Sequence, residues 1–371
     1  MSFLSFALSR RFVVIVLGAG AFIIGTCLST SAGSKIHRSS SGAFYNFQTI
    51  DDPAEDALNT QVTGINHNDN IVGVYYGTPA PTYKSFRATQ NSSGGWDFFR
   101  ELGSYSDVYL SGINDRSNMD VGFSPPWSAG ACSGLTSSIC GVVHDPNNPD
   151  GNETYQIADP SEGGGGANCA QTYLYGTSDA RIQVGYYNTS ANGGIGCKSQ
   201  AFEEYCGPST GSGYQCTPQF VDFHPPGAYS SMAYGINNKG DVVGAMTTSP
   251  GGSLVGWEYS EFHYSTIQVS SFPTQARGID WGDKVVGSYT DSSNVTRGFL
   301  MHGSDWYYPI NDGQSTVVSD IDDSWNIVGW SQLSVNGPLS GFYGTCKPNC
   351  PSLGVRGGTK VFHTSKTKGG L

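Results

Sequence analysis

The stretch Gly235-Ile236-Asn237-Asn238-Lys239-Gly240-Asp241-Val242-Val243-Gly244 occurs six times along the chain in altered forms. The copies begin near residues 64, 112, 176, 235, 278 and 320, and every copy ends on a Val-Gly pair. The third copy, Gly176-Thr177-Ser178, is the most degenerate. The closing glycines, Gly73, Gly122, Gly185, Gly244, Gly287 and Gly329, are 42 to 63 residues apart. A period near 40 residues with some longer loops is typical of the four-stranded blades of a β-propeller.

A small polar residue occupies the third position of every copy. These residues are Asn66, Asn114, Ser178, Asn237, Asp280 and Asp322. Their side chains cap tight turns by accepting a hydrogen bond from the backbone two residues further on. Gly240 and Gly282 are expected to supply the positive φ that such a turn needs. Each copy therefore predicts a hairpin, and alternating stretches such as 297–301 and 306–310 supply a third and a fourth strand.

The phase of the repeats predicts how the array closes. The last unit ends after its third strand, near residues 342–344, whereas residues 44–50 form a fourth strand with no blade before it. Together the two fragments complete one blade if the ring closes, which leaves no unpaired strand edge between the first and last units. We therefore predict an all-β fold, a six-bladed β-propeller over residues 43–345 that the N-terminal strand closes. A β-sandwich or a β-solenoid is the alternative, and neither explains this complementary phase.

Residues 1–34 have the order of a secretory signal. Arg10 and Arg11 precede an apolar run over 12–28, and small residues follow, with Thr30-Ser31-Ala32 as a cleavage site. The alternative is a retained N-terminal anchor, for which the run is short. Both predict a secreted or cell-surface protein, with no membrane insertion once a signal is removed. The tail over 346–371 is rich in Gly, Thr and Lys, and is expected to be a disordered extension.

Cysteine usage agrees with an oxidising compartment. Cys27 lies in the leader, and an even number remains: Cys132, Cys140, Cys169, Cys197, Cys206, Cys216, Cys346 and Cys350. Four disulfides are expected, and pairing between neighbours is the simplest connectivity, although the sequence does not select it. No C-x-x-C spacing or neighbouring His indicates zinc, and the oxygen-rich residues 145–153 miss the EF-hand spacing. We therefore expect no metal site.

Charge and missing motifs exclude several functions. The formal net charge is −11, which argues against nucleic acid and anionic membranes as partners. The sequence has no His-Glu-x-x-His and no phosphate-binding glycine loop, and we assign no catalytic residue and no cofactor. A non-enzyme is favoured. The alternative is a polysaccharide hydrolase or lyase that uses acids and bases of the loops, namely His67, Asp69, Asp115, Glu203, Glu204 and His224.

The insertions over residues 124–217 are the best candidate for a binding surface. They hold six of the eight cysteines outside the leader. Their tyrosines are Tyr173, Tyr175, Tyr186, Tyr187, Tyr205 and Tyr214. Disulfide-braced loops with tyrosines suit an extracellular glycan or protein as the partner, because aromatic faces stack on sugars and on protein surfaces. The alternative is that these tyrosines only fill strands, where they are favoured in any case.

The repeat also resembles a known family. The pattern Gly-Ile-Asn-x-x-Gly-Asp-Val-Val-Gly, followed by Gly287-Ser288-Tyr289-Thr290-Asp291 and Gly298-Phe299-Leu300, is similar to the HAF-family probable extracellular repeats of bacterial secreted proteins. Residues 47–53 and 220–228 resemble the linking segment of that family. The resemblance covers 44–76 and 218–344, and implies an extracellular location without implying an activity. A structural part of an extracellular assembly therefore stays a third hypothesis, and the oligomeric state stays open.

Overall fold

The computed structural model describes residues 44–51, 58–77, 82–99, 107–125, 139–146, 154–158, 169, 171–190, 197–206, 218–347 and 359–363. The regular secondary structure in these ranges consists of β-strands, which form six antiparallel sheets. The leader over 1–34 lies outside the described residues. Among the residues that are described, no helix has the length and apolar character needed to cross a membrane.

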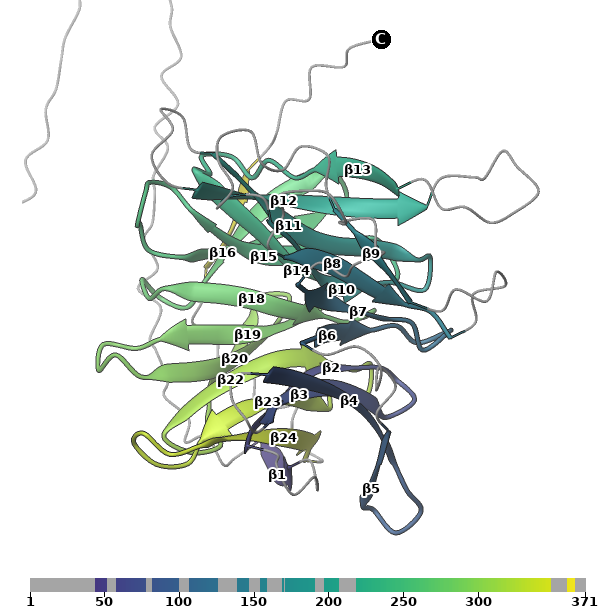
Figure 1. The fold of residues 1–371 in the computed structure, drawn as a ribbon. Helices are drawn as coiled ribbons and strands as arrows, with labels where there is room; N and C mark the ends of the chain where they lie inside the picture. Colours follow the sequence, from purple (N-terminus) through teal and green to yellow (C-terminus); the bar gives the residue numbers. More distant parts are fainter. Residues whose placement is uncertain are drawn as a thin grey trace, which may run out of the picture. The chain divides into compact units, whose positions relative to one another are not determined.

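The six sheets, named here blades I to VI, follow one another along the chain (Figure 1). Blade I contains β2 (Leu58–Ile65), β3 (Asn70–Gly77), β4 (Thr82–Gln90) and β5 (Trp96–Phe99), and blade II contains β6 (Tyr109–Ile113), β7 (Asp120–Ser124), β8 (Cys140–His144) and β9 (Thr154–Ile157). Blade III contains β10 (Gln171–Thr177), β11 (Ile182–Ser190), β12 (Cys197–Cys206) and β13 (Pro218–Asp222). Blade IV contains β14 (Ser230–Ile236), β15 (Val242–Thr247), β16 (Val255–Ser260) and β17 (His263–Gln268). Blade V contains β18 (Thr274–Ile279), β19 (Lys284–Thr290), β20 (Thr296–His302) and β21 (Asp305–Ile310), and blade VI contains β22 (Ser315–Ile321), β23 (Ile327–Gln332), β24 (Leu339–Cys346) and β1 (Tyr45–Ile50).

The first strands of the blades surround a central channel. Each of β2, β6, β10, β14, β18 and β22 contacts the first strand of the next blade, and β22 contacts β2 in turn. The six blades therefore form a closed ring, which confirms the predicted six-bladed propeller.

The ring closes in blade VI, where the two ends of the propeller meet. β1 pairs antiparallel with β24, with Gln48 opposite Tyr343 (Figure 1). The Phe47 ring meets the Phe342 ring edge to face, with 5.3 Å between centroids. Ile50 is buried in a core cluster that includes residues of β2. The predicted closure by the N-terminal strand is thus confirmed.

The Val-Gly pair that ends each copy is explained by packing inside the blade. Its valines are fully buried, and the glycine lies beside an aromatic ring of the third strand in four blades. A Cβ on Gly244 would lie 2.7 Å from the Trp257 ring, and a Cβ on Gly329 would lie 2.7 Å from the Phe342 ring. Glycine is required in all six copies because a Cβ would also collide with a backbone carbonyl oxygen of the first strand.

The hairpin turns have the predicted cap. The Asn237 Oδ1 accepts hydrogen bonds from the backbone N–H groups of Lys239 and Asp241, both at 2.9 Å. Each turn contains one residue with positive φ, namely Asp69, Asn118, Arg181, Gly240, Asp283 and Trp325. Gly240 was predicted correctly. The predicted positive φ at Gly282 is wrong. Asp283 takes the left-handed conformation (φ 62°) in its place, which Asp tolerates.

The C-terminal tail differs from expectation. β25 (Thr359–His363) pairs antiparallel with β17 and adds a fifth strand to blade IV. The expectation of a disordered extension is therefore wrong for these residues. The physical reason is that β17 is the outer strand of its blade, and its free backbone groups offer a template to any segment within reach.

Candidate functional site

The first strands approach one another so closely that glycine is needed at their contact. The first residue of each copy forms this ring, which consists of Gly64, Gly112, Gly176, Gly235, Gly278 and Asp320. A Cβ on Gly235 would lie 2.6 Å from the Arg277 carbonyl oxygen and 3.1 Å from the Gly278 Cα. A Cβ on Gly176 would lie 3.1 Å from the Gly235 Cα. The glycine of Gly-Ile-Asn therefore lets the blades meet around the channel, and blade VI departs from this rule.

Asp320 holds the sixth place in the glycine ring. Its Oδ2 accepts a hydrogen bond from the Ile65 N–H at 3.1 Å, and its Oδ1 accepts one from the Ile321 N–H at 2.9 Å. Desolvation inside the channel raises the pKa of Asp320 to about 7, although both hydrogen bonds lower it. A carboxyl group that changes its charge near neutral pH thus lies at the centre of the molecule.

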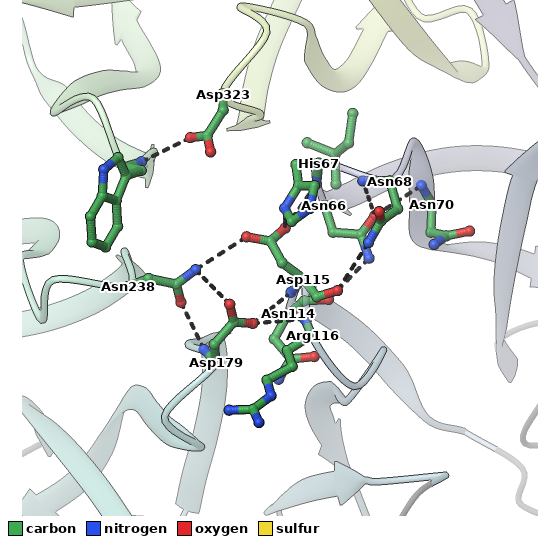
Figure 2. Close-up of polar contacts among 12 residues, drawn as sticks. Asn66, His67, Asn68, Asn70, Asn114, Asp115, Arg116, Asp179, Asn238 and Asp323 are labelled. Carbon is green, nitrogen blue, oxygen red and sulfur yellow. Dashed lines mark hydrogen bonds and ion pairs between the residues drawn. The ribbon is translucent and has the colours of Figure 1, made fainter.

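One end of the channel is formed by the hairpin turns, and we call it the polar mouth (Figure 2). It consists of the residues that follow the six turn caps: His67, Asp115, Asp179, Asn238, Trp281 and Asp323. Most of these side chains bind the backbone of the preceding blade. Asp115 accepts from the His67 N–H at 2.8 Å, Asp179 accepts from the Asp115 N–H at 3.0 Å, and Asn238 accepts from the Asp179 N–H at 2.7 Å. The polar mouth is therefore a chain of hydrogen bonds that holds the turns of neighbouring blades together.

The carboxylates of Asp115 and Asp179 at the polar mouth already accept hydrogen bonds from neighbouring groups. Asn238 Nδ2 donates to Asp115 Oδ2 at 3.2 Å and to Asp179 Oδ2 at 2.9 Å, as Figure 2 shows. The channel cavity has a volume of about 70 Å³, and its lining runs from the polar mouth to Tyr175, Tyr234 and Arg277. No group of three or more His, Cys, Asp or Glu side chains among the described residues is arranged to hold a metal ion.

The acids and bases of the hydrolase alternative are mostly apart. His67 Nδ1 lies 3.0 Å from Asp115 Oδ1, and this hydrogen bond raises the pKa of His67. Asp69 instead accepts a hydrogen bond from the Tyr343 hydroxyl at 3.1 Å. Glu203 and Glu204 lie on β12, where burial raises the pKa of Glu204 to about 8, and His224 follows β13. The structure thus brings only His67 and Asp115 together.

The other end of the channel is formed by six residues of the first strands, each of which directly precedes a member of the glycine ring. These residues are Thr63, Ser111, Tyr175, Tyr234, Arg277 and Ser319, and each sits at a β-bulge. In three blades the residue is small, and its hydroxyl donates to a carbonyl of the next blade. Thr63 donates to Leu110 O at 2.8 Å, and Ser319 donates to Val62 O at 2.9 Å. These blades are joined directly by the bulge.

In blades III, IV and V the bulge residue is large and occupies the channel end. Tyr175 and Tyr234 meet edge to face, with 5.0 Å between ring centroids. The Arg277 guanidinium lies 5.3 Å from the Tyr234 ring centroid and 5.6 Å from that of Trp330. These residues line a second cavity of about 30 Å³. We call this end of the channel the aromatic end.

Aromatic rings continue from this cavity across blades II and III. Tyr109 stacks on Phe123 with 4.7 Å between centroids, and Phe123 meets Tyr173 at 4.9 Å. Tyr173 in turn stacks on Tyr186 at 4.7 Å, and Tyr186 contacts Tyr175 at 5.8 Å. All five rings are partly exposed. The aromatic end is therefore one continuous series of rings.

Half of the predicted tyrosines belong to this series, namely Tyr173, Tyr175 and Tyr186. Tyr187 was wrong as a surface residue, because its ring is buried in the core of blade III and its hydroxyl donates to Asp222 at 3.1 Å. It follows Tyr186 on β11, and neighbouring strand residues face opposite sides of a sheet. Tyr205 is 40% exposed at the far end of β12, and Tyr214 lies outside the described residues.

The sequence reasoning missed several members of the aromatic end, namely Tyr109, Phe123, Tyr234, Arg277 and Trp330. Two positions of the repeat mark most of them. Tyr234 and Arg277 directly precede the first residue of a copy, whereas Phe123 and Trp330 directly follow a closing glycine. An alignment of the six copies by position, instead of a search for tyrosines in the insertions, points to these residues.

A disulfide lies in blade III. Cys169 and Cys197 are bonded, with 5.5 Å between their Cα atoms, next to the starts of β10 and β12. This pair is one of the expected neighbour pairs. Cys140 and Cys346 are also disulfide-bonded, and their partners are not among the described residues. Cys27, Cys132, Cys216 and Cys350 lie outside the described residues, and the side chain of Cys206 is not described.

No protein-family model matches the chain, and no curated protein matches it in sequence. The two ends of the channel therefore carry the functional inference. The polar mouth uses its side chains to hold its own turns. The aromatic end presents partly exposed rings and a cation, which are groups that recognise ligands.

Proposed function

We propose that the protein is an extracellular, non-catalytic β-propeller that binds a glycan at the aromatic end of its channel. The observation that carries this proposal is the continuous series of partly exposed rings from Tyr109 to Tyr175 and Tyr234. Sugar rings stack on aromatic faces, and tyrosine hydroxyls donate hydrogen bonds to sugar oxygens.

An extracellular location agrees with several independent features. The leader over 1–34 has the order of a secretory signal, and the Cys169–Cys197 disulfide needs an oxidising compartment. We also propose membership of the HAF-family extracellular repeat proteins, which rests on the Gly-Ile-Asn pattern alone.

A non-catalytic role is favoured by the hydrogen bonds that already occupy the carboxylates of the polar mouth. Glycoside hydrolysis needs two carboxyl groups about 5 to 9.5 Å apart on either side of the bond to be broken. The carboxylates at the polar mouth accept hydrogen bonds from backbone N–H groups and from Asn238, and Glu203 and Glu204 are neighbours on β12, so their side chains face opposite sides of blade III. The His67–Asp115 pair is the remaining candidate for proton transfer.

The test is a glycan array with the purified protein, followed by titration of any ligand found. Tyr173→Ala and Tyr186→Ala should each weaken the binding about tenfold, because each removes a stacking face worth roughly 1.4 kcal/mol. Tyr205→Ala is the matched control, since Tyr205 is exposed but lies outside the ring series. Unchanged affinity in both variants would place the ligand elsewhere. Release of reducing ends from a polysaccharide, abolished by His67→Ala, would support the hydrolase alternative instead.

A further inference from the structure

Arg277 differs in its partners from Arg87, Arg181 and Arg297. Arg87 pairs with Asp120 at 2.6 Å, Arg181 pairs with Asp145 at 2.9 Å, and Arg297 pairs with Asp291 at 3.2 Å. Arg277 forms no ion pair with a residue in the described part of the chain. Its positive charge therefore has no carboxylate from the propeller as its partner.

The hydrogen-bonding groups of Arg277 are also mostly unused. One terminal nitrogen donates to Gln275 Oε1 at 2.6 Å. The Nε atom is shielded from solvent and has no hydrogen-bond partner within the described ranges. A guanidinium has five N–H donors, and burying a donor without an acceptor costs roughly 1–3 kcal/mol or more for a charged group. This arrangement is one that an anion would complete.

The surroundings of Arg277 fix its position and leave room beside it. Tyr234 and Trp330 contact the guanidinium from two sides, which restricts its orientation. The adjoining cavity of about 30 Å³ is lined by Thr63, Ser111 and Ser319 and by no Asp or Glu, whereas the channel cavity, which Arg277 also lines, includes Asp320 in its lining. A cavity of about 10–15 Å³ holds one water molecule, so this cavity holds two oxygen-sized groups.

We propose that Arg277 binds the carboxylate of an acidic sugar, so that the glycan bound at the aromatic end is a carboxylate-bearing one such as a uronate. A carboxylate is planar and has two oxygens, which match the fork of a guanidinium in a bidentate pair. The sugar ring that carries it would lie against the neighbouring aromatic rings. This inference rests on the proposed glycan-binding function and adds the chemical class of the ligand.

Calorimetric titration with a tetragalacturonate and with its fully methyl-esterified form tests the inference. Esterification removes the charge and keeps the sugar rings. The wild-type protein should bind the acid at least about tenfold more tightly than the ester, since charge-assisted hydrogen bonds contribute roughly 1.5–3 kcal/mol. Arg277→Gln should abolish this preference and leave the affinity for the ester within about twofold. Arg277→Lys should keep part of the preference, because an ammonium group lacks the planar fork.

Arg116→Gln is the matched control, because it removes the same charge from an exposed side chain at the polar mouth. It should leave the preference for the acid unchanged, and the melting temperature of each variant confirms that it folds. Equal affinity of the wild-type protein for acid and ester, with both weakened by Tyr173→Ala, would overturn the role of Arg277 but leave the proposed function standing. Binding of neither oligosaccharide would also overturn it, and the proposed function would then depend on the glycan array. A peptide with a free C-terminal carboxylate that binds as tightly as the tetragalacturonate would overturn the assignment to a sugar.

Discussion

The backbone N–H of Ile65 donates a hydrogen bond to the Asp320 carboxylate, 3.1 Å away and 255 positions further along the chain. This bond joins the first strand of blade I to the first strand of blade VI. The other five blades have glycine at the position of Asp320, so the carboxylate occupies the one place in the ring where a side chain can reach across the closure. The closure of the propeller therefore includes a titratable group.

The stability of the protein should depend on the charge of Asp320. Its pKa is about 7 in the folded protein, against an ordinary value of 3.8. Because the folded pKa is raised, ionisation opposes folding at high pH, and this penalty shrinks as the pH falls from about 8 towards 4. Asp320→Asn keeps an acceptor for Ile65 without the charge. The variant should melt several degrees above the wild-type protein at pH 9, with a smaller difference at pH 5, in thermal unfolding followed by circular dichroism.

Asp323→Asn is the control for this experiment, because Asp323 is exposed at the polar mouth and accepts from the Trp281 N–H at 3.1 Å. It should change the melting temperature by a similar small amount at every pH. A melting temperature of Asp320→Asn that follows the wild-type pH profile in parallel would show that Asp320 does not titrate in this range.

Gly235→Ala should destabilise the propeller. The added Cβ would lie 2.6 Å from the Arg277 carbonyl oxygen, so the backbone of blade V must shift. Overpacking of this kind costs about 1–3 kcal/mol in the free energy of unfolding, measured by urea denaturation. Gly95→Ala is the control, since its Cβ would meet only the Asn91 side chain, at 3.3 Å. Equal stability of the two variants would mean that the central contact of the blades is looser than described.

Removal of the Cys169–Cys197 disulfide should destabilise blade III. The bond closes a loop with a sequence separation of 28, for which the loss of chain entropy on unfolding amounts to roughly 3–4 kcal/mol. The double variant Cys169→Ser and Cys197→Ser should therefore melt at a lower temperature under oxidising conditions. A variant with unchanged stability would indicate that the reduced loop is held in place by its other contacts.

Asp120 is the most consequential buried charge of blade II. It is fully buried, pairs with Arg87 at 2.6 Å, and lies 3.2 Å from His144 Nδ1. Asp120→Ala would leave the Arg87 charge buried without its carboxylate, which costs about 3–5 kcal/mol in urea denaturation. Asp120→Asn should cost less, because the amide oxygen still accepts a hydrogen bond from Arg87. Similar losses in both variants would show that the charge itself, and not the hydrogen bond, holds this site.

The architecture could be predicted because it is written into local and periodic features. Three sequence features indicate the same closed ring. They are the repeated Val-Gly pair, the turn caps such as Asn237, and the N-terminal strand ending at Ile50, which has no blade before it in the sequence. β25 could not be predicted, because residues 359–363 show no repeat and pair only because the edge of β17 is within reach. Local patterns specify hairpins, whereas such pairing depends on the three-dimensional arrangement.

The candidate site was predicted only in part, for a related reason. Tyr173, Tyr175 and Tyr186 belong to one blade and are near one another in the sequence. Arg277 and Trp330 belong to other blades, and only closure of the ring brings them to the same cavity. Composition also misled at Tyr187, because a tyrosine on a strand is exposed or buried according to its face.

The pairing of β1 with β24 has a consequence for biosynthesis. β1 is synthesised long before β24. Gln48 can therefore pair with Tyr343 only after almost the whole chain has been synthesised. Until then the nascent protein has an unpaired strand edge at β24 and an incomplete ring of blades, and both favour association with other chains. The pairing of the two chain ends thus delays completion of the fold until synthesis is nearly finished.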